Sequence, residues 1–321
     1  MIPLHLAITS GDRDGVGLEV SCKALSKLGP QRAARFILAC SDDTKASKEL
    51  KRLGARFKTI FVSSRDLSFK AACHLLSDLR ADEIVIWRDH GNEAAWVKAA
   101  AELALAKRLD GLVTGPVSKG RFKKLDRRFM GHTGLLAHLA KAPVQQGYAG
   151  RHLAVVLATD HVALKDVEKA LRKRSKGTTP ISRALKNAAS LKPLLSRSQK
   201  SKPIAILGLN PHAGESGLIG GFEKHLKLPK GVVGPIPGDT AFTAGSRTKY
   251  GVVVALYHDQ GLIPFKMLHG QDSGFQVSLG LPFVRTSVDH GTAQDIFGRG
   301  LANPGSMIDA INGAISLAQS K

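Results

Sequence analysis

The stretch LAVVLATDH, residues 153–161, decides the fold class, because a short apolar run ends there in polar residues and a histidine. Two later stretches repeat the pattern: IAILGLNPH at 204–212 and VVVALYH at 252–258. Runs this rich in Val, Ile, Leu and Ala are typical of strands buried on both faces. The intervening segments are long enough to hold helices. We therefore expect neighbouring parallel strands in an α/β fold.

The three histidines that end these stretches, His161, His212 and His258, are predicted to meet. The carboxyl ends of parallel strands share one edge of a sheet, and open α/β sheets bind ligands at that edge. Three imidazoles match the protein half of a metal site that keeps an open coordination position. The alternative is three unrelated loop histidines that cap turns or pair with carboxylates. Their recurrence after the same kind of strand favours the metal site.

Length and composition indicate a compact globular protein. The chain has 321 residues, 43% of them hydrophobic, which suits one large or two medium α/β domains. No apolar stretch approaches membrane-spanning length, and the N-terminus reads as a first strand, not as a signal peptide. The three cysteines, an odd number in apolar patterns, are predicted to be reduced and buried. Together these features predict a cytoplasmic protein without a membrane partner.

The formal net charge of +21 is a conspicuous feature of the composition. Lys and Arg are densest between residues 165 and 202, where apolar residues at helical spacing indicate surface helices with a basic outer face. Such a face could bind nucleic acid. Aromatic residues form only 5% of the chain, however, and no aromatic-interleaved basic motif is present. We therefore expect no nucleic-acid partner and a solvated basic face that helps to attract anionic substrates.

The N-terminal glycine-rich turn differs from the usual dinucleotide-binding motif. A strand is expected at 4–9, and the turn SGDRDGVG that follows spaces its glycines as G-x-x-x-G-x-G. This spacing lacks the close backbone approach to a pyrophosphate that the Rossmann fingerprint provides. Further along, a helix is expected at 92–110, a strand at 111–114 and a helix at 131–141. The alternation of strands and helices is typical of doubly wound sheets.

Several reactive side chains fall in turns near the three histidines. Asp259 follows His258 directly, Lys266 lies eight residues after it, and Asp239 lies in a Pro-Gly turn. Arg285 follows another apolar run, and His132 and Thr133 begin a predicted helix whose N–H groups favour anions. Lysine, arginine, threonine and a helix N-terminus together would hold a phosphate or carboxylate. Each side chain also has a structural alternative, as a solvated charge, an ion pair or a helix cap.

Five motifs together carry a family resemblance: TGPVSKG at 114–120, GHT at 131–133, GLNPHAGESG at 208–217, YHDQGLIPFK at 257–266 and LGLPFVRTSVDHGTA at 279–293. They resemble the 4-hydroxythreonine-4-phosphate dehydrogenase family of pyridoxal phosphate synthesis. The resemblance extends from the glycine turn to the end of the chain. It implies a fold similar to isocitrate and isopropylmalate dehydrogenases, with two α/β/α domains, a cleft between them, and a homodimer whose interface completes the active site.

The resemblance also implies a division of the chain. Residues 1–130 and 285–321 would form the first α/β domain, which includes the NAD loop. Residues 131–284 would form the second α/β domain, which carries the metal-ligand histidines and the dimer contacts.

Roles carry over to positions of this chain that match the family motifs. The divalent-metal ligands are His161, His212 and His258. The substrate-binding residues are His132, Thr133, Lys266, Gln276 and Arg285. The catalytic candidates for proton transfer are Asp239, Asp259 and His132. The loop that contacts NAD, or NADP, contains Asp289, His290, Gly291 and Thr292.

The chain departs from the family pattern in three places. The family turn GDPAGIGPE is GDRDGVGLE here, which places Arg13, Asp14 and Leu18 where the family has Pro, Ala and Pro. The family's GHTE is GHTG, so Gly134 removes a carboxylate. Gln276 stands where the family has a substrate-binding asparagine. These changes spare the metal ligands but bear on the choice of substrate.

The implied activity is metal-dependent oxidation and decarboxylation of 4-phosphohydroxy-L-threonine to 3-amino-2-oxopropyl phosphate. NAD or NADP would accept the hydride, and one divalent ion, zinc, magnesium or cobalt, would bind the histidines. Two alternatives stay open. One is a paralogous dehydrogenase of a related phosphorylated hydroxy acid, such as a phosphothreonate. The other is a non-catalytic homologue that binds a phosphometabolite.

Overall fold

The computed structural model describes residues 2–43, 46–175, 177–270 and 272–321, and its contacts divide the chain into two compact units. Unit 1 contains Met1–Val144 and Gln271–Lys321, and unit 2 contains Gln145–Gly270. Segments 131–144 and 271–284, which we expected in the second domain, therefore fall in unit 1. His132, Thr133 and Gln276 accordingly lie in a different unit from the three histidines.

The strands of the described part of unit 1 lie in the order β3-β4-β2-β1-β5-β12-β11. Their bounds are β1 Leu4–Thr9, β2 Ala34–Ser41, β3 Lys58–Ser63, β4 Glu83–Asp89, β5 Gly111–Thr114, β11 Phe275–Leu279 and β12 Val284–Ser287. Neighbouring strands from β3 to β12 pair in parallel, and β11 runs antiparallel to β12. The pairing with β12 explains why β11 belongs to unit 1.

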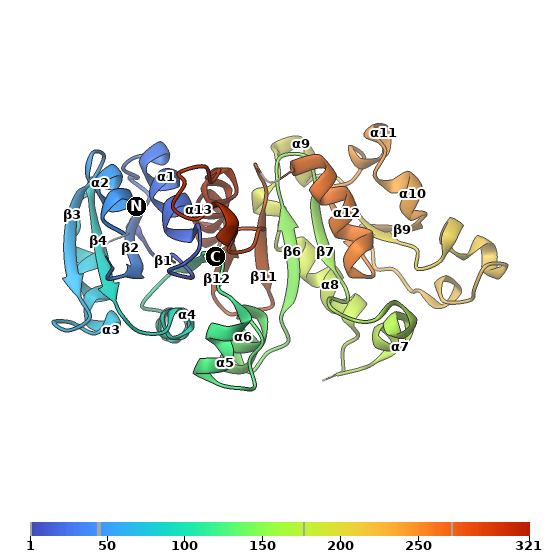
Figure 1. Cartoon of the computed structure of the whole chain (residues 1–321). Coiled ribbons are helices and arrows are strands. Elements are labelled where there is room, and N and C mark those ends of the chain that lie inside the picture. The colour runs from blue at the N-terminus through green and yellow to red at the C-terminus, as the bar shows by residue number, and fades with distance from the viewer. Residues whose placement is uncertain (1, 44–45, 176, 271) are drawn as a thin grey trace. The chain divides into compact units, whose positions relative to one another are not determined.

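Helices cover both faces of this sheet (Figure 1). Their bounds are α1 Gly17–Leu28, α2 Ala46–Gly54, α3 Phe69–Ala72, α4 Glu93–Leu105, α5 Lys119–Leu125, α6 His132–Ala140 and α13 Gly305–Ala318. α4 packs on β1, β2 and β5 and contacts α3, α5 and α6, whereas α1 packs on α2 and α13. The contact with α4 explains why α6 belongs to unit 1.

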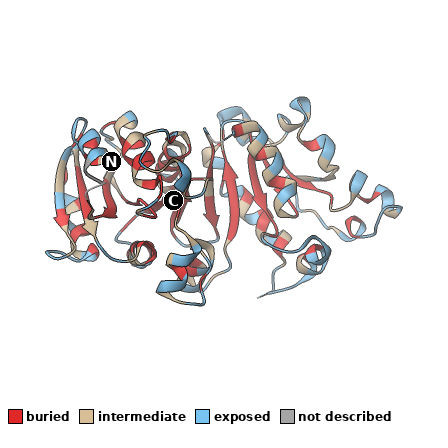
Figure 2. Cartoon of the chain, in the orientation of Figure 1, coloured by how far each residue is buried: buried red, intermediate tan, exposed pale blue. Residues whose placement is uncertain are grey.

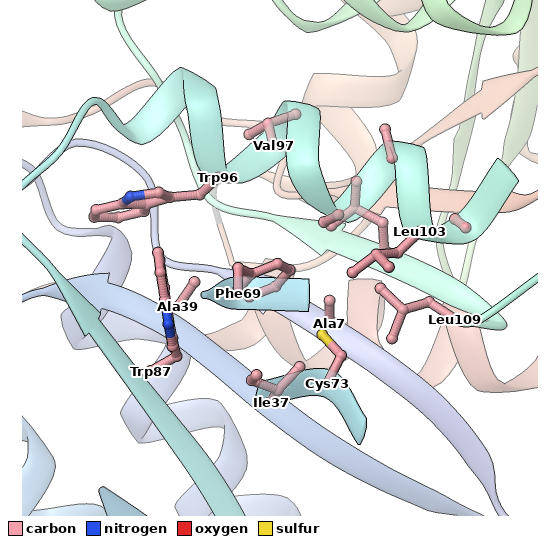
Figure 3. Close-up of a cluster of buried hydrophobic side chains, with 14 of the residues drawn as sticks. Ala7, Ile37, Ala39, Phe69, Cys73, Trp87, Trp96, Val97, Leu103 and Leu109 are labelled. Carbon is pink, nitrogen blue, oxygen red and sulfur yellow. The ribbon is translucent and has the colours of Figure 1, made fainter. Parts of the chain in front are cut away.

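The unit 1 core shows why alternate residues of the strands must be apolar. Ala7, Ile37 and Ala39 point from the sheet towards α3 and α4, where Trp87 and Trp96 meet edge to face with ring centroids 6.4 Å apart (Figure 3). Both indole N–H groups have acceptors, Leu67 O at 3.0 Å and Asp89 Oδ2 at 2.7 Å. Buried tryptophans need such partners, so these bonds fix the orientation of both rings.

In unit 2, the strands among the described residues lie in the order β6-β7-β10-β8-β9. Their bounds are β6 Gln145–Ala149, β7 Ala154–Leu157, β8 Ile204–Leu207, β9 Val232–Ile236 and β10 Val252–Ala255. β6 and β7 are antiparallel, and β7, β10, β8 and β9 are parallel neighbours. The three histidine-terminated runs are thus adjacent parallel strands, as predicted, and they are buried throughout (Figure 2).

The unit 2 strands are also covered by helices. Their bounds are α7 Val167–Arg172, α8 Pro180–Ala189, α9 Arg197–Lys200, α10 Gly238–Ala241, α11 Ala244–Arg247 and α12 His258–His269. α12 packs on β7 and β10 through Phe265, and α8 packs on β6, β7, β8 and β10. The prediction of an α/β fold is confirmed. Within the described residues, no helix combines the length and apolar character needed to cross a membrane.

Candidate active site

The carboxyl edge of the unit 2 strands carries all three predicted metal ligands. His161 follows β7, His258 follows β10, and His212 follows β8. Because β10 lies between β7 and β8, its histidine is flanked by the loops that carry the other two. Parallel strands deliver their following loops to one edge, so this arrangement is what the apolar runs predict.

Two of the three histidines lie together, and a carboxylate joins them. The ring centroids of His161 and His258 are 5.4 Å apart. Together with Asp160 they offer ligand atoms that all lie within 4.8 Å of one another. This span approaches what one cation bridges with bonds of about 2.0–2.2 Å. Among the described residues, His212 is not part of this group.

Asp160 is a site residue that the sequence reasoning missed, although it directly precedes His161. Its Oδ2 accepts a hydrogen bond from Gln146 Nε2, and the hydroxyl of Tyr148 donates to Gln146 Oε1. Its Oδ1 is buried without a hydrogen-bond partner in the described part of the chain. An orphaned carboxylate oxygen beside two imidazoles suits a divalent cation, so these side chains fit a metal.

Hydrogen bonds between strand ends hold this edge in place. Thr159 donates its hydroxyl to Leu256 O at 2.6 Å, which joins the ends of β7 and β10. Gln260 accepts from Leu256 N–H at 2.7 Å and donates to Gly208 O at 2.7 Å, which joins β10 to the chain after β8. The loops that carry the histidines therefore start from anchored backbone.

His212 lies in the segment Pro211–Gly217, whose backbone is unusual. His212, Ala213, Glu215 and Ser216 all have left-handed φ values between 41° and 55°. Non-glycine residues adopt this region at a cost, and such strain concentrates at functional sites. The conformation turns His212 into solvent, where its side chain is exposed. A periodicity argument cannot foresee this, because it assumes regular backbone up to the turn.

Glu223 anchors the start of this segment. Its Oε1 accepts from the backbone N–H groups of Leu209, at 2.8 Å, and Asn210, at 2.7 Å, and its Oε2 accepts from the Asn210 amide at 3.0 Å. Burial opposes ionisation of this carboxyl, but the hydrogen bonds from Asn210 and Leu209 outweigh it and hold the pKa of Glu223 below its usual value. An ionised Glu223 thus fixes the chain that leads to His212.

A hollow of about 600 Å³ at the same edge brings the acidic candidates to His212. Asp239, Asp259 and His212 all line it. Asp259 Oδ1 also lies 2.7 Å from His258 Nδ1. A carboxylate on one ring nitrogen orients an imidazole and leaves the other nitrogen for a metal. The structure therefore groups the two predicted acidic residues with two of the predicted histidines.

Lys266 is placed differently from the other unit 2 candidates. It lies in the last turn of α12, whereas His258 begins that helix. Eight residues of α-helix separate them by about 12 Å along the axis. Within unit 2, Lys266 is therefore remote from the histidine of its own helix.

The remaining substrate-binding candidates lie in unit 1. Arg285 on β12 is only 1% exposed, and its guanidinium donates to Gln276 Oε1 at 2.7 Å, to Ser278 Oγ at 3.0 Å and to the Thr114 hydroxyl. The amide of Gln276 thus orients Arg285. Arg285 was predicted in a turn after an apolar run, but it lies within β12 and is part of the packed interior of unit 1.

His132 and Thr133 form the first turn of α6, which has no side-chain cap. The Nε2 atom of His132 is buried and has no hydrogen-bond partner among the described residues, and its ring meets Phe122 edge to face. Burial, and then the positive charge of Arg285, hold the pKa of His132 well below its usual value. His132 is therefore neutral near pH 7. A neutral imidazole can donate one hydrogen bond but adds no positive charge.

The predicted cofactor loop is attached to the first turn of unit 1. Thr292 O accepts from Val16 N–H at 3.0 Å, and Asp289 exchanges hydrogen bonds of 3.1 Å with Ser306. Lys23 of α1 donates to Gly300 O and Ala302 O at 2.9 and 2.8 Å. Beside this loop lies a hollow of about 490 Å³, whose lining includes Gly15 and segment 297–299.

Arg13 and Asp14, two of the departures in the glycine turn, belong to a group of charged side chains around the buried Glu93. Glu93 has a fully buried side chain and binds Arg13 Nε at 2.7 Å and Arg121 Nε at 3.1 Å. Arg121 also lies 3.7 Å from Asp14. Burial raises the pKa of the adjacent Asp12 despite a hydrogen bond from Ser118. The two unexpected charges therefore belong to one ionic network at the ends of β1 and β5.

Fold and site together define an α/β enzyme with reactive side chains at the carboxyl ends of its strands. The model of the protein family described as pyridoxal phosphate biosynthetic protein PdxA matches residues 88–314. The chain belongs to this family. The chain is accordingly an oxidoreductase of the dehydrogenase type, as its relatives are named.

Three similar proteins illustrate the relationship. A Bradyrhizobium diazoefficiens protein with the provisional name D-threonate 4-phosphate dehydrogenase is 37% identical, over 99% of this chain and 98% of its own length. A Geobacter metallireducens 4-hydroxythreonine-4-phosphate dehydrogenase is 35% identical, over 99% and 96%. The crystal structure of 4-hydroxythreonine-4-phosphate dehydrogenase from Klebsiella pneumoniae superposes with a TM-score of 0.71 at 28% identity, over 98% and 100%.

Proposed function

We propose that the chain oxidises and decarboxylates 4-phosphohydroxy-L-threonine to 3-amino-2-oxopropyl phosphate, with NAD or NADP as hydride acceptor and one divalent ion, zinc, magnesium or cobalt. Family membership supports the reaction type. The single structural observation that carries the proposal is the group of Asp160, His161 and His258 at the carboxyl edge of unit 2. Imidazole and carboxylate ligands suit such ions.

His161 and His258 would hold the ion, with His212 as the third predicted ligand. A bound divalent ion lowers the pKa of a substrate hydroxyl and stabilises the negative charge that develops on oxygen. Asp259 orients the His258 ring through their 2.7 Å contact. Asp259 or Asp239 accepts the one proton that the hydroxyl loses in this proposal.

Anion recognition would use the unit 1 residues and Lys266. Thr133 and the uncapped N–H groups of α6 offer donors for the substrate phosphate. His132, being neutral, contributes a hydrogen bond, and Gln276 holds Arg285 in place as a fixed positive charge. Lys266 would add a second positive charge.

Cofactor binding is assigned to Asp289, His290, Gly291 and Thr292. The backbone of this loop is tied to α1, and glycines border the adjacent hollow of about 490 Å³, so the segment fits the nucleotide part of a dinucleotide. When bound, the nicotinamide would supply the hydride acceptor for oxidation of the substrate carbon. The hydroxyl proton would pass to a carboxylate of the protein, and the bond to the substrate carboxylate would then break to release CO₂. The residual carbanion takes up one proton.

The first test is formation of NADH from 4-phosphohydroxy-L-threonine by purified protein, with zinc, magnesium or cobalt added in turn. We expect turnover that depends on the metal and is lost in His258→Ala. The exposed His225→Ala is the matched control and should keep the activity. Substrate binding without NADH formation across all three metals would contradict the proposal and favour a non-catalytic homologue.

A second candidate activity is oxidation of D-threonate 4-phosphate. The Bradyrhizobium relative carries that substrate in its name. The open space beside the Gly134 backbone, where the family pattern has a glutamate, also favours a different substrate. The same assay with both phosphorylated acids decides between the activities, because the true substrate should give the higher kcat/KM.

We also propose a homodimer whose partner completes the site. Ile263 and Met267 on α12 are large, apolar and 58% and 82% exposed, and both line the hollow that contains His212. Exposed apolar side chains of this kind mark association surfaces. A partner's helix could also bring a lysine where Lys266 of the same chain is remote from His258.

Mixing two inactive variants tests the shared site. His258→Ala and Lys266→Ala, unfolded together and refolded, should regain about a quarter of wild-type activity if each site takes the two residues from different copies. Refolding each variant alone is the control. Absence of recovery in mixtures that contain heterodimers would contradict a shared site.

A cytoplasmic location is also part of the proposal. The three cysteines are free and buried, and burial raises the pKa of Cys40 and Cys73 to about 12, as expected for inert reduced thiols.

A further inference from the structure

A second hollow lies in unit 2, at the opposite end of the strands from the histidines. It has a volume of about 900 Å³ and includes Ile204 and Val232, the first residues of β8 and β9, in its lining. α8 and the segment 225–231 form its walls. His161, His212 and His258 follow the other ends of the same sheet, so this hollow is separate from the candidate metal site.

The floor of the hollow is apolar. Leu171, Leu185 and Phe222 line it and are at most 9% exposed. Ile181 and Leu226 extend the same surface. A ligand seated here would contact hydrocarbon over part of its surface, which favours a molecule that carries an apolar or flat organic group.

The rim of the hollow is strongly basic. Its exposed cationic side chains are Arg172, Arg174, Lys186, Lys192, Lys227 and Lys230, together with the titratable His225. Among the lining residues that the structure describes, none is Asp or Glu. Within the described residues, the rim cation with a carboxylate partner is Arg172, which binds Glu168 at 2.9 Å and lies over the Phe222 ring at 5.2 Å. The rim therefore concentrates like charges that an anion would stabilise.

These features exclude two other occupants. A second copy of this face would bring two sets of cations together, since residues 145–270 contain 19 Lys and Arg against 7 Asp and Glu. A single-stranded nucleic acid would need exposed aromatic platforms, but the aromatic lining residue, Phe222, is only 4% exposed. The volume is in the range of small-molecule sites, about 300–1,000 Å³.

We propose that this hollow, the α8 hollow, binds a small organic polyphosphate of the nucleotide class. Its phosphates contact rim lysines, which include Lys186, Lys227 and Lys230, and its apolar group lies on the Leu171, Leu185 and Phe222 floor. This binding site is independent of the dehydrogenase reaction and accounts for the basic surface between residues 165 and 202. The basic rim and the apolar floor both contribute to the affinity. A polyphosphate without an organic group therefore binds more weakly.

The test is calorimetric titration of the full chain with ATP, without divalent ions. Lys227→Glu/Lys230→Glu should weaken ATP binding at least about tenfold. Lys200→Glu/Lys249→Glu changes the net charge equally at exposed residues outside the hollow and should leave the affinity within about twofold. Circular dichroism of both variants confirms that they fold.

Two further titrations identify the ligand class. Tripolyphosphate should bind at least about fivefold more weakly than ATP, because it cannot contact the floor. His258→Ala should bind ATP as the wild type does, so failure of the dehydrogenase proposal would leave this result unchanged. The proposal is overturned by absence of saturable ATP binding, by equal losses in the two lysine pairs, by equal affinity for tripolyphosphate, or by RNA that displaces ATP.

Discussion

The site histidines of unit 1 and unit 2 differ in how far they are buried. In unit 1 the Nε2 atom of His132 is buried, and the neighbouring Arg285 is fixed by three side-chain acceptors. In unit 2 the His161 side chain is 80% exposed and His212 lies on a strained surface segment. The unit 1 residues are thus positioned by packing, whereas the unit 2 residues are positioned by anchored strand ends. Substitutions of the unit 1 residues should lower the free energy of unfolding. Substitutions of the unit 2 residues should lower the affinity for a ligand.

Arg285→Met should produce the largest loss of stability. It leaves the oxygens of Gln276, Ser278 and Thr114 without their shared donor in the interior. We expect the free energy of unfolding to fall by about 3 kcal/mol, measured by urea denaturation. The exposed Arg151→Met is the control and should change it by less than about 0.5 kcal/mol. A comparably small loss for Arg285→Met would remove the contrast between the units.

A substitution in the group of Asp160, His161 and His258 should change the affinity for a metal ion. Asp160→Asn keeps the side-chain size but replaces the carboxylate beside His161 and His258 with a neutral amide. We expect zinc affinity to fall by about 10–100-fold in calorimetric titrations, while the unfolding free energy of the metal-free protein changes little. Asp166→Asn, an exposed acid outside the group, is the matched control. Unchanged zinc affinity in Asp160→Asn would show that Asp160 takes no part in binding.

Acid should destabilise unit 1 through His132. Its pKa is held low in the folded chain but returns to about 6.5 on unfolding, so below that pH the unfolded state binds more protons. Stability contributed by the neutral ring is therefore present above pH 6.5 and is lost as the pH falls below it. The difference in Tm between wild type and His132→Gln should narrow from pH 7 to pH 5. A difference independent of pH would contradict a buried neutral His132.

Gly134→Glu should have the smallest effect on the fold. A side chain at this exposed position meets open space, and a carboxylate in the first turn of α6 complements the helix dipole. We expect stability to rise by about 0.5–1 kcal/mol, since glycine is a poor helix former. Combined with Gln276→Asn, it should shift the kcat/KM ratio between 4-phosphohydroxy-L-threonine and D-threonate 4-phosphate. An unchanged ratio would show that these two departures do not select the substrate.

The sequence predicted those parts of the molecule in which local pattern and tertiary environment agree. β7, β8 and β10 are short apolar runs, and their pairing brings His161 and His258 together as expected. β6 was missed because its sequence, QQGYA, is polar. Gln145 is nevertheless buried there, because its amide donates to Ala158 O and Pro180 O. Hydrogen bonds to residues that are distant in the sequence allow this polar side chain to be buried. The spacing of apolar residues along the sequence does not reveal such bonds.

The site was predictable to the extent that it follows directly from strand ends. The place of His212 depends on five consecutive left-handed residues, and that of Arg285 on acceptors from three other segments. Neither can be derived from spacing. Asp160 could have been found, because it is adjacent to His161 at the end of the same strand.

The buried carboxylate of Glu93 limits which residue the glycine turn can carry at position 13. Arg13 gives it both a guanidinium contact and a backbone N–H bond of 3.3 Å, and a proline at position 13 could supply neither. Replacing Arg13 by proline would leave the buried carboxylate with the Arg121 contact of 3.1 Å and without either Arg13 bond. We therefore expect this substitution to destabilise unit 1 unless Glu93 is replaced at the same time.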